Sequence, residues 1–105
     1  AVPQFDVYRN PDAATRARFP FLLEIQSDLL ESLATRVVVP LAAAGDDATP
    51  IARLMPVFEV GGKRVVMRTP EIAGVPRKAI GAHVGSLAVH RHEIVAALDV
   101  LVTGV

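Results

Sequence analysis

The sequence contains no cysteine. This absence excludes disulfides, thiolate catalysis, zinc–thiolate sites and iron–sulfur clusters, and it favours a reducing compartment. A secretory signal would begin with basic residues and an apolar run, and neither opens this chain. The stretch from Val37 to Gly45 is free of charged residues but far shorter than the roughly 20 residues of a membrane helix. We therefore expect a soluble, cytoplasmic protein.

The chain also lacks an excess of charge of either sign, because 11 Lys and Arg balance 11 Asp and Glu. Nucleic-acid binding normally shows a basic excess, since phosphate neutralisation supplies most of the affinity. One local excess exists between Lys63 and Lys78, where a single acid, Glu71, stands among five cations. These cations are Lys63, Arg64, Arg68, Arg77 and Lys78. They form either a solvated strand face or a surface for an acidic partner.

The 105 residues correspond to one domain, 1–105. Alternation predicts strands over 4–9, 19–25 and 36–41, with Phe19, Phe21, Leu23 and Ile25 on one face of the second. Pro40 has no amide hydrogen and implies an edge or a bulge. Gly61-Gly62 joins strands over 55–60 and 63–68 in a hairpin. Residues 45–50 are expected to form a loop, 72–76 a short strand or irregular piece, and 80–85 a linker.

One helix is expected after Ser86, which is a suitable N-cap. Leu87, Ile94, Leu98 and Leu101 repeat at spacings of seven, four and three and form an inward stripe. The helix ends near Thr103, and Gly104 suits the position after a helix end. Short strands followed by one terminal helix indicate a mainly β (α+β) protein, with a twisted antiparallel sheet or small barrel and the helix attached.

No catalytic or cofactor motif is present, and we expect no cofactor and no metal. The histidines are His83, His90 and His92, and the last two point about 200° apart on a helix, so they cannot share a metal. No Gly-x-Ser-x-Gly, Walker loop or nucleotide fingerprint occurs. All three histidines are interpreted as ordinary surface residues.

Two apolar groups remain without an assigned partner. Leu29-Leu30 follows the turn residues Ser27-Asp28 and lies outside the strand alternation. It is either a satellite core contact or an exposed contact surface. The last residues, from Val102 to Val105, are apolar at a chain end, which needs a partner in the core or in another molecule. Docking, rather than chemistry, is indicated.

Three stretches of the chain resemble the CcdB toxins of bacterial toxin–antitoxin pairs. The first is Gln4-Phe5-Asp6-Val7-Tyr8. The second runs from Glu24 to Leu30 and is followed by the valine–proline strand from Arg36 to Ala42. The third is the helix that contains His90-Arg91-His92-Glu93-Ile94 and ends in Gly104-Val105. The resemblance spans nearly the whole chain.

This resemblance implies an SH3-like β fold with a C-terminal helix, assembled as a two-fold homodimer. It also implies a function without catalysis, because well-known members bind the A subunit of DNA gyrase and trap its cleaved-DNA state. Their binding residues correspond to Leu29, Leu30, Asp99, Val102, Thr103, Gly104 and Val105. The family's antitoxin partner has a flexible acidic tail that wraps the toxin and neutralises it, and the cations from Lys63 to Lys78 are a candidate surface for it. DNA is contacted only through the antitoxin complex, which represses transcription.

The chain departs from this pattern at one position. Gyrase-poisoning plasmid-borne members end in Trp-Gly-Ile, whereas this chain ends in Thr103-Gly104-Val105. Loss of a tryptophan at an interface costs on the order of 2 to 4 kcal/mol, the scale of a binding hot spot.

Two alternatives to gyrase poisoning stay open. A sister family with the same fold cleaves messenger RNA, which requires an acid or base at the 2′-hydroxyl. Arg36, His83 and Glu59 are the residues considered for that role, although no motif places them together. The second alternative is a relic that binds its antitoxin and co-represses transcription without poisoning a target.

Overall fold

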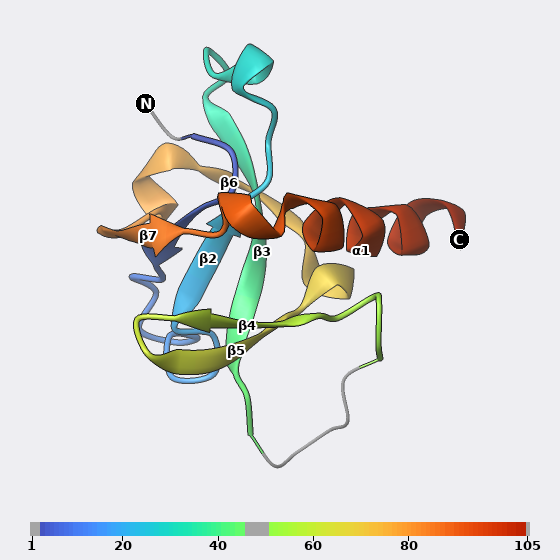
Figure 1. Cartoon of the computed structure of the whole chain (residues 1–105). Helices are drawn as coiled ribbons and strands as arrows, with labels where there is room; N and C mark the ends of the chain where they lie inside the picture. Colours follow the sequence, from blue (N-terminus) through green and yellow to red (C-terminus); the bar gives the residue numbers. More distant parts are fainter. Residues whose placement is uncertain (1–2, 46–50, 105) are drawn as a thin grey trace.

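The computed structural model describes residues 3–45 and 51–104. The predicted loop residues 46–50 and the terminal Val105 lie outside the described residues. In the described residues, seven strands are followed by one helix (Figure 1). The strands are β1 (Asp6–Arg9), β2 (Phe21–Glu24), β3 (Thr35–Ala43), β4 (Val57–Val60), β5 (Lys63–Met67), β6 (Ala73–Pro76) and β7 (His83–Ser86). The helix is α1 (Arg91–Thr103), and the 3₁₀ turns are η1 (Asp28–Leu30), η2 (Thr69–Glu71), η3 (Arg77–Ala79) and η4 (Ala88–His90).

The strands form one curled antiparallel sheet in the order β4-β5-β3-β2-β1-β7, and β6 pairs separately with β3. Alternation places one set of apolar side chains on the inner face, where α1 covers them. The core contains Phe5, Val7, Phe21, Leu23, Val39, Leu41, Phe58, Val60, Val65, Met67, Leu87, Ile94 and Ala97. The expected mainly β fold with a terminal helix is confirmed.

The second strand is shorter than the sequence predicts. Phe21 and Leu23 point into the core, whereas Leu22 and Glu24 are buried on the opposite face. Phe19, predicted to share the core face, instead lines a surface hollow together with Leu22. The reason is local: Pro20 follows Phe19, and the Asn10 amide donates to the Phe19 carbonyl at 2.9 Å, so the chain is already turning there.

The central strand β3 contains Pro40, and the prediction of an edge or bulge at this residue is wrong. On one side β3 pairs with β2 throughout its middle, with Leu22 opposite Pro40. On the other side β6 pairs with residues 35–38 and β5 pairs with residues 41–43. The Pro40 carbonyl faces that second side, where it accepts from the Arg68 amide at 2.9 Å. The missing amide hydrogen therefore falls in the gap between β6 and β5 and leaves no unpaired ladder position.

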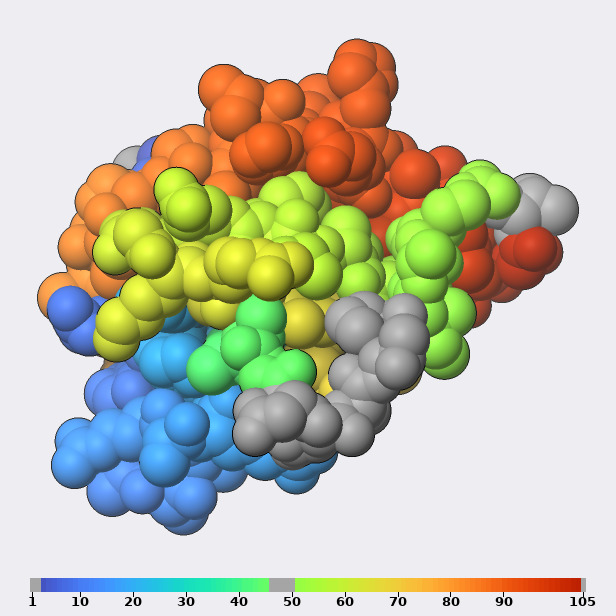
Figure 2. All heavy atoms as spheres, turned by 60° about the horizontal axis from the view of Figure 1, so that its bottom comes forward, coloured from blue at the N-terminus to red at the C-terminus, as the bar shows by residue number. Residues whose placement is uncertain are grey.

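The hairpin of β4 and β5 forms as predicted. Gly61 and Gly62 have φ of 56° and 80°, the left-handed pair that a two-residue turn needs between twisted strands. The hairpin lies against the start of the helical segment (Figure 2), where the Phe58 ring contacts the His90 ring at a centroid distance of 4.9 Å. Of the two structures predicted for 72–76, a short strand or an irregular piece, the short strand is confirmed as β6.

Residues 80–85 are not a linker, as the sequence suggested, but lead into strand β7. This strand pairs with β1, with Asp6 opposite Ser86 and Tyr8 opposite His83. Val84 is its one large apolar residue and packs against the core, so four residues show no apolar alternation and the local sequence carries only a weak strand signal. The free edge of β1 supplies the hydrogen bonds that make it a strand.

The helix begins later than predicted. Ser86 Oγ accepts from the Ala88 amide at 3.1 Å, but the 3₁₀ turn η4 follows first, with Leu87 as its N-cap residue, and α1 itself begins at Arg91. Gly104 ends the helix with φ of 79° and donates to the Val100 carbonyl, as expected. Leu87 and Ile94 are buried and Leu98 packs on the core, whereas Leu101 is exposed because the helix extends beyond the sheet.

In the part of the chain that is described, no helix has the length and apolarity to span a membrane.

Candidate docking site

Leu29 and Leu30 lie on a loop that protrudes from the sheet (Figure 1). The Leu29 side chain is 93% exposed and that of Leu30 is 48% exposed. Leu33 in the same loop is also exposed. Of the two interpretations left open by the sequence, the satellite core contact is therefore wrong. Several large apolar side chains exposed together mark a contact surface.

Hydrogen bonds give this loop a defined shape. Ser27 Oγ accepts from the Leu29 amide at 3.2 Å and thereby caps η1, which confirms the turn expected at Ser27-Asp28. Asp28 Oδ1 accepts from the Gln4 amide at 2.8 Å. Gln26, which is buried, accepts from the Val37 amide at 3.0 Å and donates to the Leu30 carbonyl at 2.8 Å. The Gln-Ser-Asp motif therefore builds the loop that presents the leucines.

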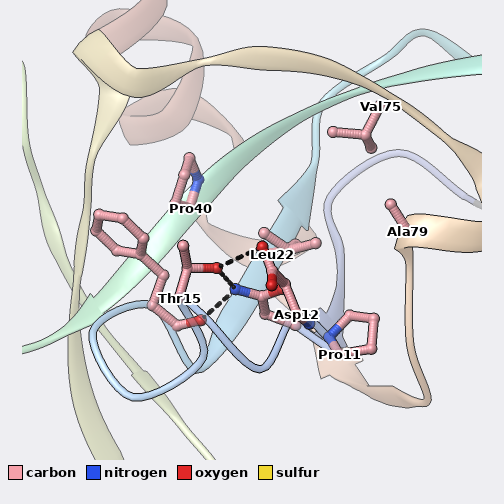
Figure 3. A pocket seen from close by; sticks show the side chains of 9 residues that line it. Pro11, Asp12, Thr15, Leu22, Pro40, Val75 and Ala79 are labelled. Carbon is pink, nitrogen blue, oxygen red and sulfur yellow. Dashed lines mark hydrogen bonds between the residues drawn. The ribbon is translucent and has the colours of Figure 1, made fainter.

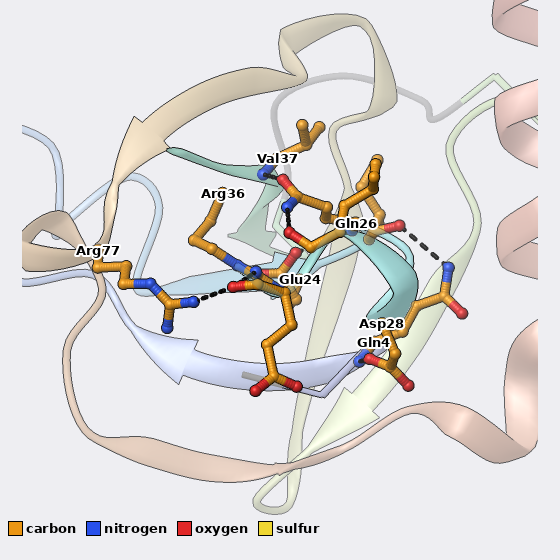
Figure 4. Close-up of polar contacts among 10 residues, drawn as sticks. Gln4, Glu24, Gln26, Asp28, Arg36, Val37 and Arg77 are labelled. Atoms are coloured by element: carbon orange, nitrogen blue, oxygen red, sulfur yellow. Dashed lines mark hydrogen bonds and ion pairs between the residues drawn. The ribbon is translucent and has the colours of Figure 1, made fainter. Parts of the chain in front are cut away.

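A buried ion pair underlies the loop (Figure 4). Arg36 Nε donates to Glu24 Oε1 at 3.1 Å, and both side chains are fully buried. Arg36 also donates to the Glu31 carbonyl at 3.3 Å, while Glu24 Oε2 accepts from the Gln26 amide at 2.8 Å. Burial raises the pKa of Glu24, and the Gln26 amide and the guanidinium of Arg36 act in the opposite direction. The pair connects the sheet to the protruding loop.

The C-terminal end of α1 carries the second predicted group. Asp99, Val102, Thr103 and Gly104 are exposed, Val102 by 79%. Thr103 Oγ1 donates back to the Asp99 carbonyl at 2.8 Å, so its hydroxyl is occupied within the helix. Residues 51–54 run beside this end of α1 (Figures 1 and 2), and Ile51 among them is exposed. The described part of the tail is therefore not sequestered in the core of its own subunit.

One chain does not bring the two predicted groups together. The leucine loop is tied to the start of α1, because Gln4 bonds Asp28 and also accepts from Arg91 at 3.4 Å. Val102 lies eleven residues beyond Arg91, about 16 Å along the helix axis. Figure 1 shows the loop and the C-terminus pointing in different directions. A single continuous surface would require a second subunit.

The five cations between Lys63 and Lys78 are distributed over three places. Lys63 and Arg64 lie at the hairpin turn, beyond the Ala43 end of β3. Arg77 and Lys78 lie in η3, beyond the Thr35 end of β3, roughly 25 Å away by strand rise. Arg68 is paired with Glu71 at 2.7 Å. The stretch is continuous in sequence but not in space.

A surface hollow of about 400 Å³ lies on the outer face of the sheet (Figure 3). Its walls include Phe19, Leu22, Pro40, Val75 and Ala79. Asn10 at its edge donates to Thr15 Oγ1 and to the Phe19 carbonyl, both at 2.9 Å. The side-chain amide of Asn10 therefore bonds to residues of its own loop. The hollow lies between this loop and the sheet.

The residues considered for ribonuclease chemistry do not converge. Arg36 is fully buried against Glu24, and Glu59 lies opposite Arg64 at the far end of β3. His83 on β7 instead forms a hydrogen bond with Asp6 at 2.9 Å and contacts the Tyr8 ring edge-on. Within residues 3–45 and 51–104, no group of three His, Asp or Glu side chains is placed to hold a metal.

Sequence reasoning missed two contributors to this surface. Val89, 88% exposed in η4, lies near the helix start that Gln4 connects to the leucine loop. The sequence did contain a signal for this exposure, because Val89 lies off the inward stripe that includes Leu87 and Ile94. Arg77 donates to the Glu31 carbonyl, and no sequence signal connects residues 46 positions apart.

The fold is a curled antiparallel sheet with one terminal helix, and a loop with exposed apolar side chains protrudes from it. The chain belongs to the CcdB family: the model described as CcdB protein matches residues 4–104. It is a CcdB family toxin of a toxin–antitoxin system.

Two solved structures share the fold at low identity. An endoribonuclease in complex with its cognate antitoxin, from a mycobacterial species, is 16% identical with a TM-score of 0.71, and the match covers 94% of this chain and 92% of that one. An endoribonuclease from a mycobacterial species is also 16% identical, with a TM-score of 0.68 and coverage of 94% and 89%. At this identity the likeness establishes the fold alone.

Proposed function

We propose that this toxin acts as a homodimer that binds the A subunit of DNA gyrase and traps its cleaved-DNA complex, without a catalytic site of its own. The observation that supports the proposal is the exposure of Leu29, Leu30 and Val102, which correspond to residues that the resembled toxins use to bind gyrase. Apolar side chains exposed in this way gain free energy when a partner covers them, about 25 cal/mol per Å².

A second subunit supplies the geometry that one chain lacks. A two-fold contact uses the same patch on both subunits, and an axis that passes near the end of α1 brings the two helix ends side by side. The paired ends of α1, with Leu101 and Val102, then form one apolar surface. Thr103 provides less contact area than the tryptophan of plasmid-borne members, so we expect weaker binding here, by roughly 30- to 1,000-fold.

The proposed test is a gyrase supercoiling and DNA-cleavage assay with the purified chain. We expect inhibition and accumulated double-strand breaks. We expect Leu29→Asp or deletion of 103–105 to lower potency at least tenfold. The free energy of unfolding should change little, since Leu29, Thr103 and Gly104 are exposed. Val57→Asp on the edge strand β4 is the matched control, because it adds the same charge at an exposed valine away from both groups. Fully active Leu29 and tail variants would refute the site.

A ribonuclease is the second candidate, motivated by the names of the two similar structures. The dispersed positions of Arg36, Glu59 and His83 argue against it. Incubation of the same preparation with messenger RNA decides between the two functions. Specific RNA cleavage that His83→Ala abolishes would replace the gyrase proposal.

Neutralisation is proposed to come from an antitoxin with an acidic disordered tail. The separation of Lys63 and Arg64 from Arg77 and Lys78 by about 25 Å suits an extended segment better than a compact partner. At about 3.3 Å per residue, eight residues of an extended tail span that distance. In this proposal the complex, rather than the toxin alone, contacts operator DNA.

A further inference from the structure

The loop that presents the leucines has little side-chain burial of its own. Every side chain from Asp28 to Thr35 is exposed. Loops are usually held in shape by burying some of their side chains, and this one points its apolar groups into solvent instead. Its conformation therefore depends on hydrogen bonds to its backbone.

Two backbone carbonyls of the loop are held by side chains from outside it. The Leu30 carbonyl accepts from Gln26 at 2.8 Å. The next carbonyl, that of Glu31, accepts from Arg36 at 3.3 Å and also from an Nη of Arg77 (Figure 4). Gln26 and Arg36 are buried parts of the sheet, whereas Arg77 is an exposed residue of η3 that reaches the loop from 46 positions further along the chain.

We propose that Arg77 is a positioning residue for the docking surface: by holding the Glu31 carbonyl it keeps Leu29 and Leu30 in the conformation that the partner binds. The inference rests on the proposed function, because it concerns the geometry of that same surface. A loop fixed before binding loses less conformational freedom when the complex forms, so affinity rises without any new contact. Arg77 then acts through the loop and does not touch the partner.

The charge of the Arg77 guanidinium also acts on Glu24, which belongs to the buried ion pair. Burial raises the pKa of Glu24, and attraction to Arg77 is among the effects that oppose this rise. A guanidinium suits the position, since it stays charged and donates several hydrogen bonds in a fixed fork. Lysine at the same position would keep the charge but lose the fork.

The first measurement is amide hydrogen exchange on the free protein. The amides of Leu30, Glu31 and Leu33 are bonded within the loop at 2.9, 3.2 and 3.1 Å and report its opening. We expect Arg77→Met to accelerate their exchange about 5- to 30-fold, the range for loss of one charge-assisted hydrogen bond at a partly solvated site. Arg77→Lys should give an intermediate rate. Arg16→Met, another exposed arginine on a different loop, is the control and should leave the rates unchanged.

The second measurement is gyrase binding by the same variants. We expect Arg77→Met to weaken binding in the wild-type background and to have little further effect in a Leu29→Ala/Leu30→Ala background. Unchanged exchange in Arg77→Met would overturn the proposal, and so would an equal loss of binding in both backgrounds, which would indicate direct contact. If the wild-type chain does not bind gyrase, the proposed function fails, while the exchange data still decide whether Arg77 holds the loop.

Discussion

Glu24 and Arg36 show how a single buried pair connects two parts of this protein. Both side chains are fully buried, and their polar atoms also bond the backbone at Gln26 and Glu31. Removing charges from water is costly, and the cost is offset only where such additional hydrogen bonds are made. The pair therefore holds the loop in position and also stabilises the sheet.

The raised pKa of Glu24 predicts a pH dependence of stability. Folded Glu24 keeps its proton to higher pH than the unfolded chain, whose value is near 4.5, so the folded state binds more protons in the interval between the two. The free energy of unfolding contributed by Glu24 is therefore fully present below that interval and falls as the pH rises through it. We expect the difference in unfolding free energy between wild type and Glu24→Gln to decrease as the pH rises above about 4.5.

Urea denaturation at a series of pH values measures this difference. Glu59→Gln, which removes an exposed carboxylate on β4, is the control and should show no comparable decrease. A difference between wild type and Glu24→Gln that increases with pH would show that the ion pair outweighs burial.

Among the elements, the hairpin of β4 and β5 is the most locally determined. Gly61 and Gly62 adopt left-handed φ values, and a Cβ at either position meets no atom within 4 Å. The cost of a side chain there is consequently conformational and not steric. The opposite case is β7, whose strand geometry depends on pairing with β1.

Substitution of Gly62 tests the turn. We expect Gly62→Val to lower the free energy of unfolding by about 1 to 2 kcal/mol, because a β-branched residue is strained at a φ of 80°. Gly62→Asn should cost distinctly less, since asparagine tolerates the left-handed region. Chemical denaturation of both variants provides the comparison, and equal stability of the valine variant and wild type would contradict the turn geometry.

At the scale of the whole molecule, the exposed apolar residues lie at separated places. Leu29, Leu30 and Val89 lie toward the start of α1, and Leu101 and Val102 lie toward its end. When two such subunits pair about a two-fold axis, exposed apolar side chains at the interface become buried, which does not happen in the single subunit. The proposed homodimer follows from this distribution together with the family resemblance.

Dimerisation predicts that thermal stability depends on concentration. Association of folded subunits stabilises them by mass action, so we expect the Tm to rise when the protein is concentrated a hundredfold. Sedimentation across the same range should show twice the mass of one 11.2 kDa chain at the upper end. A constant Tm together with a monomer mass at every concentration would exclude the proposed arrangement.

Features that depend on neighbouring residues could be predicted from the amino-acid sequence alone. Alternation predicted the core faces of β1 and β2, Gly61-Gly62 predicted the hairpin, and Gly104 predicted the helix end. These are local because backbone φ and side-chain direction depend on the residue itself and on the strand or helix period. The resemblance to the family likewise rested on short motifs that remain contiguous in the chain.

Features that depend on residues distant in sequence became visible only in the folded chain. It made residues 83–86 a strand, placed Pro40 between two partners of β3, and separated the five cations. It also brought Arg77 to the Glu31 carbonyl and exposed Leu29. Burial and pairing of this kind arise from the packing of the whole sheet, and no local pattern encodes which distant group arrives at a given backbone atom.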